Sequence, residues 1–252
     1  MTVRIALPEP TRSDTEYNAR SLPQYIAALQ SAGAVPSIVP LHESPDRIAR
    51  LLASVHAVLL PGSRFDIDPQ IYGETRIAAC SDADPARAAA DELLLQDAFN
   101  LRKPVLGICG GMQALNVWRN GSLIQDLVES GRTLVNHSPG RTVANAHEIR
   151  IEPLARLAAI APPTSAPIPV NSSHHQAVKV PGDNLRIAAV CPDDGTIEAI
   201  ELNSPDQFVL GVQWHPERTY TTSAFSRAIF AALVREAEAW ARHHADATAV
   251  PA

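Results

Sequence analysis

One stretch of the sequence reads Val105-Leu106-Gly107-Ile108-Cys109-Gly110-Gly111-Met112-Gln113, an apolar run that meets a glycine-rich turn around a cysteine. Its first four residues predict a fully buried strand, and a helix is predicted to begin near Gly110. The G-x-C-x-G spacing is the thiol counterpart of the nucleophile elbow, where a reactive side chain sits on a sharp strand-to-helix turn. Glycines two residues before and after the cysteine remove side chains that would collide there.

Cys109 has two interpretations on this segment alone. As a nucleophile, its sulfur would face the helix N-terminus, whose free N–H groups and positive dipole end favour a thiolate and can receive an oxyanion. As a structural residue, it would be a buried thiol beside glycines that only permit tight strand–helix packing. The glycines on both sides favour the nucleophile interpretation of Cys109 but do not exclude the structural one.

Strands and helices alternate before this stretch. Strands are predicted at residues 3–7, 35–39 and 57–60, and helices at about 22–32, 47–54 and 84–101. Asp84 is the expected N-cap of the last helix, with Pro85 at its first position. Strand, helix and strand in this rhythm indicate a parallel sheet covered by helices on both faces.

The second half of the chain has a different pattern. Short connections join strands predicted at residues 147–151, 185–190, 197–202 and 209–213, which favours an antiparallel extension. A helix at about 221–244 is predicted to close the fold, and 245–252 to form a frayed tail. We therefore predict one α/β domain over residues 1–252, with a doubly wound, mostly parallel central sheet of the flavodoxin-like type.

Composition excludes several classes of protein. Of the 252 residues, 46% are hydrophobic and 19% charged, and the net charge is -6, unlike a basic nucleic-acid binder. Pro8 and Pro10 interrupt the first apolar run, and no run reaches the ~18 residues of a membrane span. The three cysteines are an odd number without a CxxC pair, which favours reduced thiols. We expect a cytoplasmic protein without nucleic-acid or membrane partners.

A second candidate catalytic group follows the strand predicted at 209–213. His215 and Glu217 lie two residues apart in Trp214-His215-Pro216-Glu217, so in extended geometry both side chains point to one side. Glu217 could then hold the tautomer of His215, as the base and its orienting carboxylate do in a triad. Alone, such a pair is more often solvated in a loop. Ligands of open α/β sheets bind outside the carboxyl ends of the strands, where Cys109 is also expected.

These motifs together resemble the class I glutamine amidotransferase superfamily, whose signature pairs G-[IV]-C-x-G-x-Q, here at 107–113, with a later H-P-E, here at 215–217. More narrowly, the chain resembles the gamma-glutamyl-gamma-aminobutyrate hydrolase family. Residues 60–74 are similar to its PGG…DxDPxxYGE loop, 170–176 to its VNSxHHQ segment, and 194–199 to its DGxxEA segment.

The resemblance implies a mechanism and a set of site residues. Cys109 would attack a γ-glutamyl carbonyl, His215 would handle the proton and Glu217 would orient His215. The oxyanion would accept N–H groups from Gly62 and Gly110, and a thioester would form before water releases glutamate. Further candidates for substrate binding are Gln113, Ser172, Ser173, His174 and Asp68.

The chain departs from the family pattern at two positions. Close relatives often carry Arg after the cysteine, where this chain has Gly110, and Ser63 replaces the second glycine of the PGG loop. Because an oxyanion hole uses backbone N–H groups, neither change removes a donor. Gly110 could alter the mouth of the pocket and so the preferred leaving amine.

We predict no metal and no other cofactor. His174 and His175 could suggest a metal site, but no third ligand has a plausible spacing in the sequence. Asp66 and Asp68 could bind calcium, yet an EF-hand loop needs more acids and a fixed glycine. A loop that gates the substrate is the favoured interpretation there.

The expected function is hydrolysis of γ-glutamyl amides of small amines, such as γ-glutamylated GABA or polyamine intermediates. One alternative is a glutaminase subunit that delivers ammonia to a partner synthase. Another is an inactive relative retained for binding, which the intact Cys109, His215 and Glu217 argue against. The resemblance implies a small-molecule γ-glutamyl substrate as partner, and a homodimer because related enzymes are often dimers.

Overall fold

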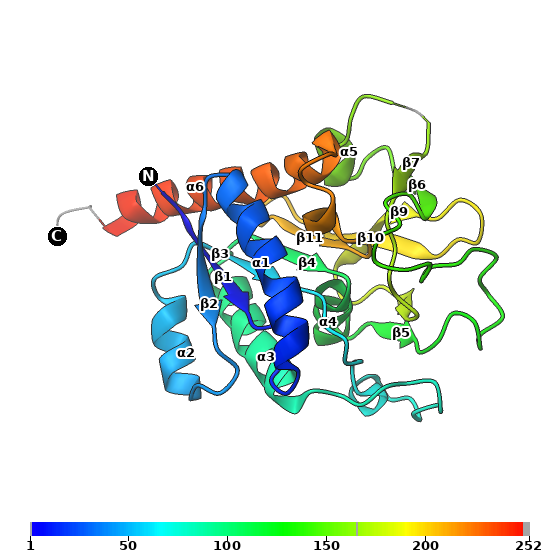
Figure 1. Cartoon of the computed structure of the whole chain (residues 1–252). Coiled ribbons are helices and arrows are strands. Elements are labelled where there is room, and N and C mark those ends of the chain that lie inside the picture. Colours follow the sequence, from blue (N-terminus) through cyan, green and yellow to red (C-terminus); the bar gives the residue numbers. More distant parts are fainter. Residues whose placement is uncertain (1, 165, 249–252) are drawn as a thin grey trace.

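The computed structural model describes residues 2–164 and 166–248, in which strands from both halves of the chain form one sheet (Figure 1). Its strands are β1 (Arg4–Pro8), β2 (Val35–Val39), β3 (Ala57–Leu60), β4 (Val105–Ile108), β5 (Ser122–Ile124), β6 (His147–Ile151), β7 (Ile168–Val170), β8 (Ala177–Val180), β9 (Leu185–Val190), β10 (Ile197–Leu202) and β11 (Val209–Val212). The helices are α1 (Thr15–Ser31), α2 (Pro45–Leu52), α3 (Pro85–Asn100), α4 (Gly110–Trp118), α5 (Arg156–Ile160) and α6 (Ala224–Thr248), with short 3₁₀ turns at Pro69–Tyr72 and Pro216–Arg218.

The sheet has a parallel half and an antiparallel half. Its order is β2-β1-β3-β4-β11-β10-β9-β6-β7, and β8 pairs with both β10 and β5. The pairs from β2 to β11 are parallel, whereas β11–β10 and those beyond it are antiparallel. The predicted fold class, a mostly parallel α/β sheet with an antiparallel extension, is confirmed.

Helices cover both faces of the parallel half. Ile5 and Leu7 of β1 pack in a core cluster with α1 and α6, whereas Ala6 packs in another with α2 and α3. The strands β3, β4 and β11 divide their side chains between the same two clusters. Strands buried on both faces have continuous apolar sequences, which is why these runs predicted the parallel half correctly.

The helix limits differ from the prediction at two places. Helix α1 begins at Thr15, seven residues before the predicted start, because Asp14 caps it by accepting a hydrogen bond from Tyr17 N at 2.8 Å. Pro23 lies inside this helix, although proline is more often found in a first turn. Helix α6 reaches Thr248, so the prediction of a frayed tail is wrong for 245–248, and residues 249–252 lie outside the described part.

Helix α3 agrees with its prediction. The Asp84 carboxylate accepts from Ala86 N and Arg87 N, and Pro85 occupies the first position. Among residues 2–164 and 166–248, no helix is both long and apolar enough to cross a membrane.

Candidate active site

Cys109 lies on the strained turn that the sequence predicts, between β4 and α4. Its backbone has φ 52° and ψ -111°, a positive-φ conformation that residues other than glycine rarely adopt. A Cβ on Gly107 would lie 2.7 Å from Gly111 O, and one on Gly111 would lie 2.1 Å from Leu60 O. Both glycines are therefore required by close backbone approach, as the elbow motif predicts.

His215 reaches the same place from the adjacent strand. Strands β4 and β11 are parallel neighbours, and Cys109 N donates to Val212 O at 2.8 Å. A Cβ built on Gly62 would lie 3.4 Å from Cys109 Cβ and 3.1 Å from His215 Cε1. The cysteine and histidine side chains thus flank one point, although more than a hundred residues separate them in the sequence.

Glu217 completes the arrangement on the far side of the imidazole. His215 Nδ1 and Glu217 Oε1 are 2.7 Å apart, and both residues are 2% exposed. Since the carboxylate accepts a hydrogen bond from the Nδ1–H group, the proton of the neutral ring is on Nδ1. Nε2 is then the nitrogen that can take a proton from a nucleophile. The geometry allows nucleophilic attack with general-base assistance.

Asn171 holds the backbone of His215 and was not among the predicted site residues. Its side-chain oxygen accepts from His215 N at 2.9 Å, and its side-chain nitrogen donates to His215 O at 2.8 Å. The sequence signal was present, because Asn171 lies in the VNSxHHQ-like segment, but its contact with His215 depends on the tertiary fold.

Burial dominates the electrostatics of the pair. It raises the pKa of Cys109 to about 12, against the lowering effects of Arg218 and of Gly110 N–H. Burial likewise lowers the pKa of His215 to about 4, although Glu217 opposes this. The pKa of Glu217 is lowered because His215 and Arg218 outweigh the effect of burial. Burial thus works against the thiolate that the helix N-terminus would favour.

The two expected oxyanion donors differ in their availability. Gly62 N–H donates to the Tyr25 hydroxyl at 3.0 Å, so it is not free in this conformation, contrary to the expectation. Gly110 opens helix α4, directly after the nucleophile. A Cβ on Gly110 would lie 3.1 Å from Ser63 N, which places the Ser63 N–H beside it as a further candidate donor.

The loop carrying Gly62 is held from α3. Arg87 is buried and donates to Pro10 O at 2.9 Å and Pro61 O at 2.6 Å, while its Nε pairs with Asp91 at 2.7 Å. A single guanidinium therefore fixes the ends of β1 and β3 against α3, next to the nucleophile.

Most of the expected substrate-binding side chains already have partners within the protein. Gln113 Nε2 donates to Gln176 O at 3.1 Å and Gln213 Oε1 at 3.2 Å, and Ser172 Oγ donates to His137 O at 2.5 Å. Asp68 caps the turn at Pro69–Tyr72. These contacts indicate positioning roles for Gln113, Ser172 and Asp68, whereas Ser173 is half-buried.

Arg218 is a candidate that the sequence reasoning missed. Its side chain is 8% exposed and its Nε lies 3.5 Å from Glu217 Oε1. Within the described part of the chain, its Nε and one terminal nitrogen have no hydrogen-bond partner. A buried guanidinium with unused donors beside the nucleophile can receive a carboxylate. Its position directly after H-P-E was the available signal.

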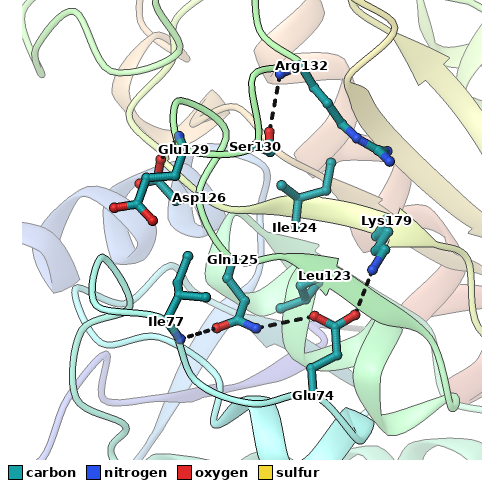
Figure 2. Close-up of a pocket in the computed structure, with 10 residues that line it drawn as sticks. All are labelled: Glu74, Ile77, Leu123, Ile124, Gln125, Asp126, Glu129, Ser130, Arg132 and Lys179. Atoms are coloured by element: carbon teal, nitrogen blue, oxygen red, sulfur yellow. Dashed lines mark hydrogen bonds and ion pairs between the residues drawn. The ribbon is translucent and has the colours of Figure 1, made fainter.

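Residues 66–74, which we call the acidic loop, contact the rest of the protein at both ends. Asp66 lies 3.0 Å from His175 Nε2, and Asp126 lies 3.1 Å from His175 Nδ1. Figure 2 shows the other end, where Glu74 contacts Lys179 at 2.8 Å and Gln125 at 3.2 Å. Glu74, Gln125 and Lys179 line an open pocket that contains none of the catalytic candidates. The contacts favour a structural role for the acidic loop over the gating role expected from the sequence.

Four buried side chains converge near His174, and we call them the His₃Glu cluster: His137, His147, His174 and Glu198. One ligand-type atom from each lies within 4.8 Å of all the others. The sequence offers no third ligand at a plausible spacing, whereas the structure brings His174 together with three residues from distant segments, and His175 is not one of them. The spacing of these residues in the sequence does not indicate that their side chains lie together.

Comparison with known proteins shows the family of the chain. The peptidase C26 family matches residues 5–217, a range that contains the cysteine, the histidine and the glutamate. The chain belongs to this family. It is 34% identical over 218 residues to the gamma-glutamyl-gamma-aminobutyrate hydrolase PuuD of Escherichia coli strain K12, covering 84% of each chain. The resemblance found in the motifs is thereby confirmed.

Two further similarities have different weight. Protein NtpR of Enterococcus hirae is 33% identical over 214 residues, covering 84% of this chain and 87% of its own. A Thermoplasma acidophilum crystal structure, described as a putative GMP synthase subunit, matches with a TM-score of 0.67 at 14% identity, covering 97% of this chain and 98% of its own. At that identity the structure supports the fold alone. The family and its named relatives support a glutamine amidotransferase-like hydrolase.

Proposed function

We propose that this peptidase C26 member hydrolyses the γ-glutamyl amide bond of small γ-glutamyl amines, with γ-glutamyl-γ-aminobutyrate or a polyamine-derived analogue as substrate. The observation that carries the proposal is the meeting of Cys109, on its strained elbow, with the His215–Glu217 pair at the end of the adjacent strand. The name of the Escherichia coli relative supports the choice of substrate.

The proposed reaction begins from the neutral pair. Cys109 Sγ attacks the γ-carbonyl carbon as its proton moves to His215 Nε2, and the carbonyl oxygen becomes an oxyanion. The C–N bond then breaks, His215 gives the proton to the leaving amine, and a thioester remains. Water, deprotonated by His215, attacks the thioester carbonyl and releases glutamate with return of the proton to the thiolate. Glu217 stabilises the imidazolium that forms twice in this sequence.

The surrounding groups suggest how the substrate is held. The oxyanion would accept hydrogen bonds from the N–H groups of Gly110 and Ser63, or from that of Gly62 after Tyr25 moves. Removing one such donor typically costs on the order of 10²–10³ in rate. The unused guanidinium nitrogens of Arg218 would pair with the α-carboxylate of the glutamyl group.

The test compares γ-glutamyl-γ-aminobutyrate, γ-glutamyl-putrescine and glutamine as substrates for the isolated chain, with release of amine or ammonia as the readout. We expect amine release by the wild type and none by Cys109→Ala. Cys80→Ala is the matched control, because that thiol is also buried but accepts a hydrogen bond from Gln176 and plays no part in the mechanism.

Two outcomes contradict the proposal. Equal activity of Cys109→Ala and wild type would place the chemistry elsewhere. Ammonia release from glutamine that needs a partner protein, with no hydrolysis of either γ-glutamyl amine, would favour the glutaminase subunit instead.

A further inference from the structure

The His₃Glu cluster lies in the antiparallel half and has no task in the proposed reaction. His137 precedes β6, His147 is its first residue, His174 lies between β7 and β8, and Glu198 is in β10. All four side chains are at most 2% exposed. Four segments far apart in the sequence therefore bring ionisable groups to one enclosed point.

The converging atoms lack hydrogen bonds. In the described part of the chain, His137 Nδ1, His147 Nε2, His174 Nε2 and both Glu198 oxygens are buried without a hydrogen-bond partner. Buried polar groups normally have hydrogen-bond partners, and a buried carboxylate without one is especially costly. The three nitrogens lie 3.3–3.6 Å from Glu198 Oε1 without making a hydrogen bond to it, which points to a further group between them.

In His147 and His174, the hydrogen bond made by Nδ1 fixes the tautomer and therefore what Nε2 presents to the centre of the cluster. His147 Nδ1 lies 3.1 Å from Glu148 O, and His174 Nδ1 lies 2.9 Å from Gln176 O. A carbonyl oxygen only accepts, so both Nδ1 atoms carry protons. If these rings are neutral, each Nε2 presents a lone pair to the Glu198 carboxylate, which is repulsive unless a cation lies between them.

In His137 the two ring nitrogens exchange these roles. Its Nε2 lies 2.9 Å from Asp194 Oδ2, which leaves Nδ1 facing Glu198. An imidazole whose second nitrogen is held by a carboxylate or carbonyl is the usual arrangement of a metal-binding histidine. All three histidines satisfy this requirement.

The spacing suits a tetrahedral ion. Glu198 Oε1 lies 3.3 Å from His137 Nδ1, 3.4 Å from His147 Nε2 and 3.6 Å from His174 Nε2. In a tetrahedral zinc site with bonds of about 2.0–2.1 Å, neighbouring ligand atoms lie about 3.3–3.4 Å apart. These separations are long for direct hydrogen bonds, whose donor–acceptor distance is typically about 2.9–3.0 Å.

We propose that His137, His147, His174 and Glu198 bind a divalent transition-metal ion, with zinc as the occupant, in a closed structural site. Three imidazoles and one carboxylate are nitrogen-rich for calcium or magnesium, which prefer all-oxygen shells. Four protein ligands without solvent access leave no open coordination position, as in structural zinc sites.

A neighbouring group competes less well for the ion. His137, Cys191 and Asp194 also approach one another. However, Asp194 Oδ2 already pairs with His137 Nε2 and accepts from Thr133 Oγ1 at 3.0 Å. Asp194 therefore supports His137 from outside the metal site.

The ion would stabilise the part of the fold that holds the catalytic histidine. His137 O accepts from His174 N at 3.0 Å and from Ser172 Oγ, and the same segment carries Asn171, which binds the backbone of His215. The metal would thus act on His215 only through these positioning contacts.

The test uses the full chain without a histidine tag, purified without chelators, and measures its metal content by mass spectrometry. We expect about one zinc per chain, loss of the metal in His147→Ala, and retention in His175→Asn. His175 is the matched control because it adjoins His174 and pairs with two carboxylates outside the cluster.

Reconstitution keeps the test independent of folding defects in the variant. Wild-type protein is stripped with a chelator and its melting temperature is followed as Zn²⁺, Co²⁺ or Mg²⁺ is added. We expect a rise of several degrees with Zn²⁺, the visible absorption of tetrahedral cobalt with Co²⁺, and no change with Mg²⁺. A metal-free chain whose melting temperature ignores Zn²⁺, or equal metal content in wild type and His147→Ala, would overturn the proposal.

Discussion

At the residue scale, burial of the nucleophile and its base disfavours their charged forms. It raises the pKa of Cys109 to about 12 and lowers that of His215 to about 4. The stability of the imidazolium that forms during the proposed reaction is therefore important. Glu217 is the group placed to supply it.

Replacing Glu217 with glutamine should lower kcat substantially with little change in KM. The neutral amide cannot stabilise imidazolium, and it can turn to hold the wrong tautomer of His215. We expect a loss on the order of 10²–10⁴ in kcat, the range of general acid–base contributions. Steady-state kinetics with a γ-glutamyl amine would measure it.

Glu92→Gln serves as its control, because Glu92 is exposed on α3 and its substitution also removes one negative charge. A fall of kcat that is the same in both variants would show that Glu217 does not act through His215.

The residues that could be predicted from the sequence are those whose roles follow from local geometry. Cys109 was identified because the elbow needs glycines at fixed positions, and Glu217 because two residues of extended chain bring it to His215. Arg218 and the His₃Glu cluster were missed since their significance depends on which segments meet in three dimensions. Gly62 shows the reverse case, where a plausible backbone donor is already bound by Tyr25.

At the element scale, the same distinction explains the strands. Runs buried on both faces, such as 57–60 and 105–108, are recognisable from composition alone. The three-residue strands β5 and β7 gave no such signal, and β7 contains Pro169. They are strands because neighbours pair with them, so tertiary contacts rather than local sequence decide their structure.

The long connection between β3 and α3 also depends on side-chain contacts. It has one short turn of regular structure, at Pro69–Tyr72, yet Asp66 fixes it to His175 and Glu74 fixes it to Lys179. The hydrogen bond that His175 donates to Asp66 outweighs burial and raises the pKa of His175 to about 8, with a further contribution from Asp126. The attachment of this loop should therefore depend on pH.

The sign of this dependence follows from the raised pKa. A histidine that binds its proton more tightly when folded stabilises the fold fully below its ordinary pKa of 6.5, and this stabilisation is lost as pH rises through about 8. We expect the melting temperature to fall between pH 6.5 and pH 8 more in wild type than in His175→Asn. A series of thermal melts across this range measures the difference.

The other histidines with shifted pKa values do not account for a difference between wild type and His175→Asn over this pH range. Those of His56, His147 and His215 are lowered by burial, so their effects on stability fall below pH 6.5. His137, which lies between Asp194 and Glu198, is unchanged in the variant. Parallel curves for wild type and His175→Asn would show that the loop attachment does not titrate.

At the scale of the whole molecule, the candidate site lies where the two halves of the sheet join. Cys109 follows β4 in the parallel half, and His215 follows β11, the last parallel strand, which pairs on its other side with antiparallel β10. Asn171 reaches His215 from the antiparallel half. The predicted order of strands and helices was enough to place the nucleophile and base at one edge, but not to show that the extension supports them.

Because these catalytic and positioning groups come from one chain, activity should not require a second copy or a synthase. We expect specific activity toward a γ-glutamyl amine to stay constant over about a thousandfold dilution, whether or not the chain forms the expected homodimer. Activity assays paired with light scattering at each concentration would test this. A loss of activity that follows dissociation, and its recovery on reconcentration, would mean that a neighbouring protomer completes or stabilises the site. Constant activity across a dimer-to-monomer transition would assign the complete catalytic unit to the single chain.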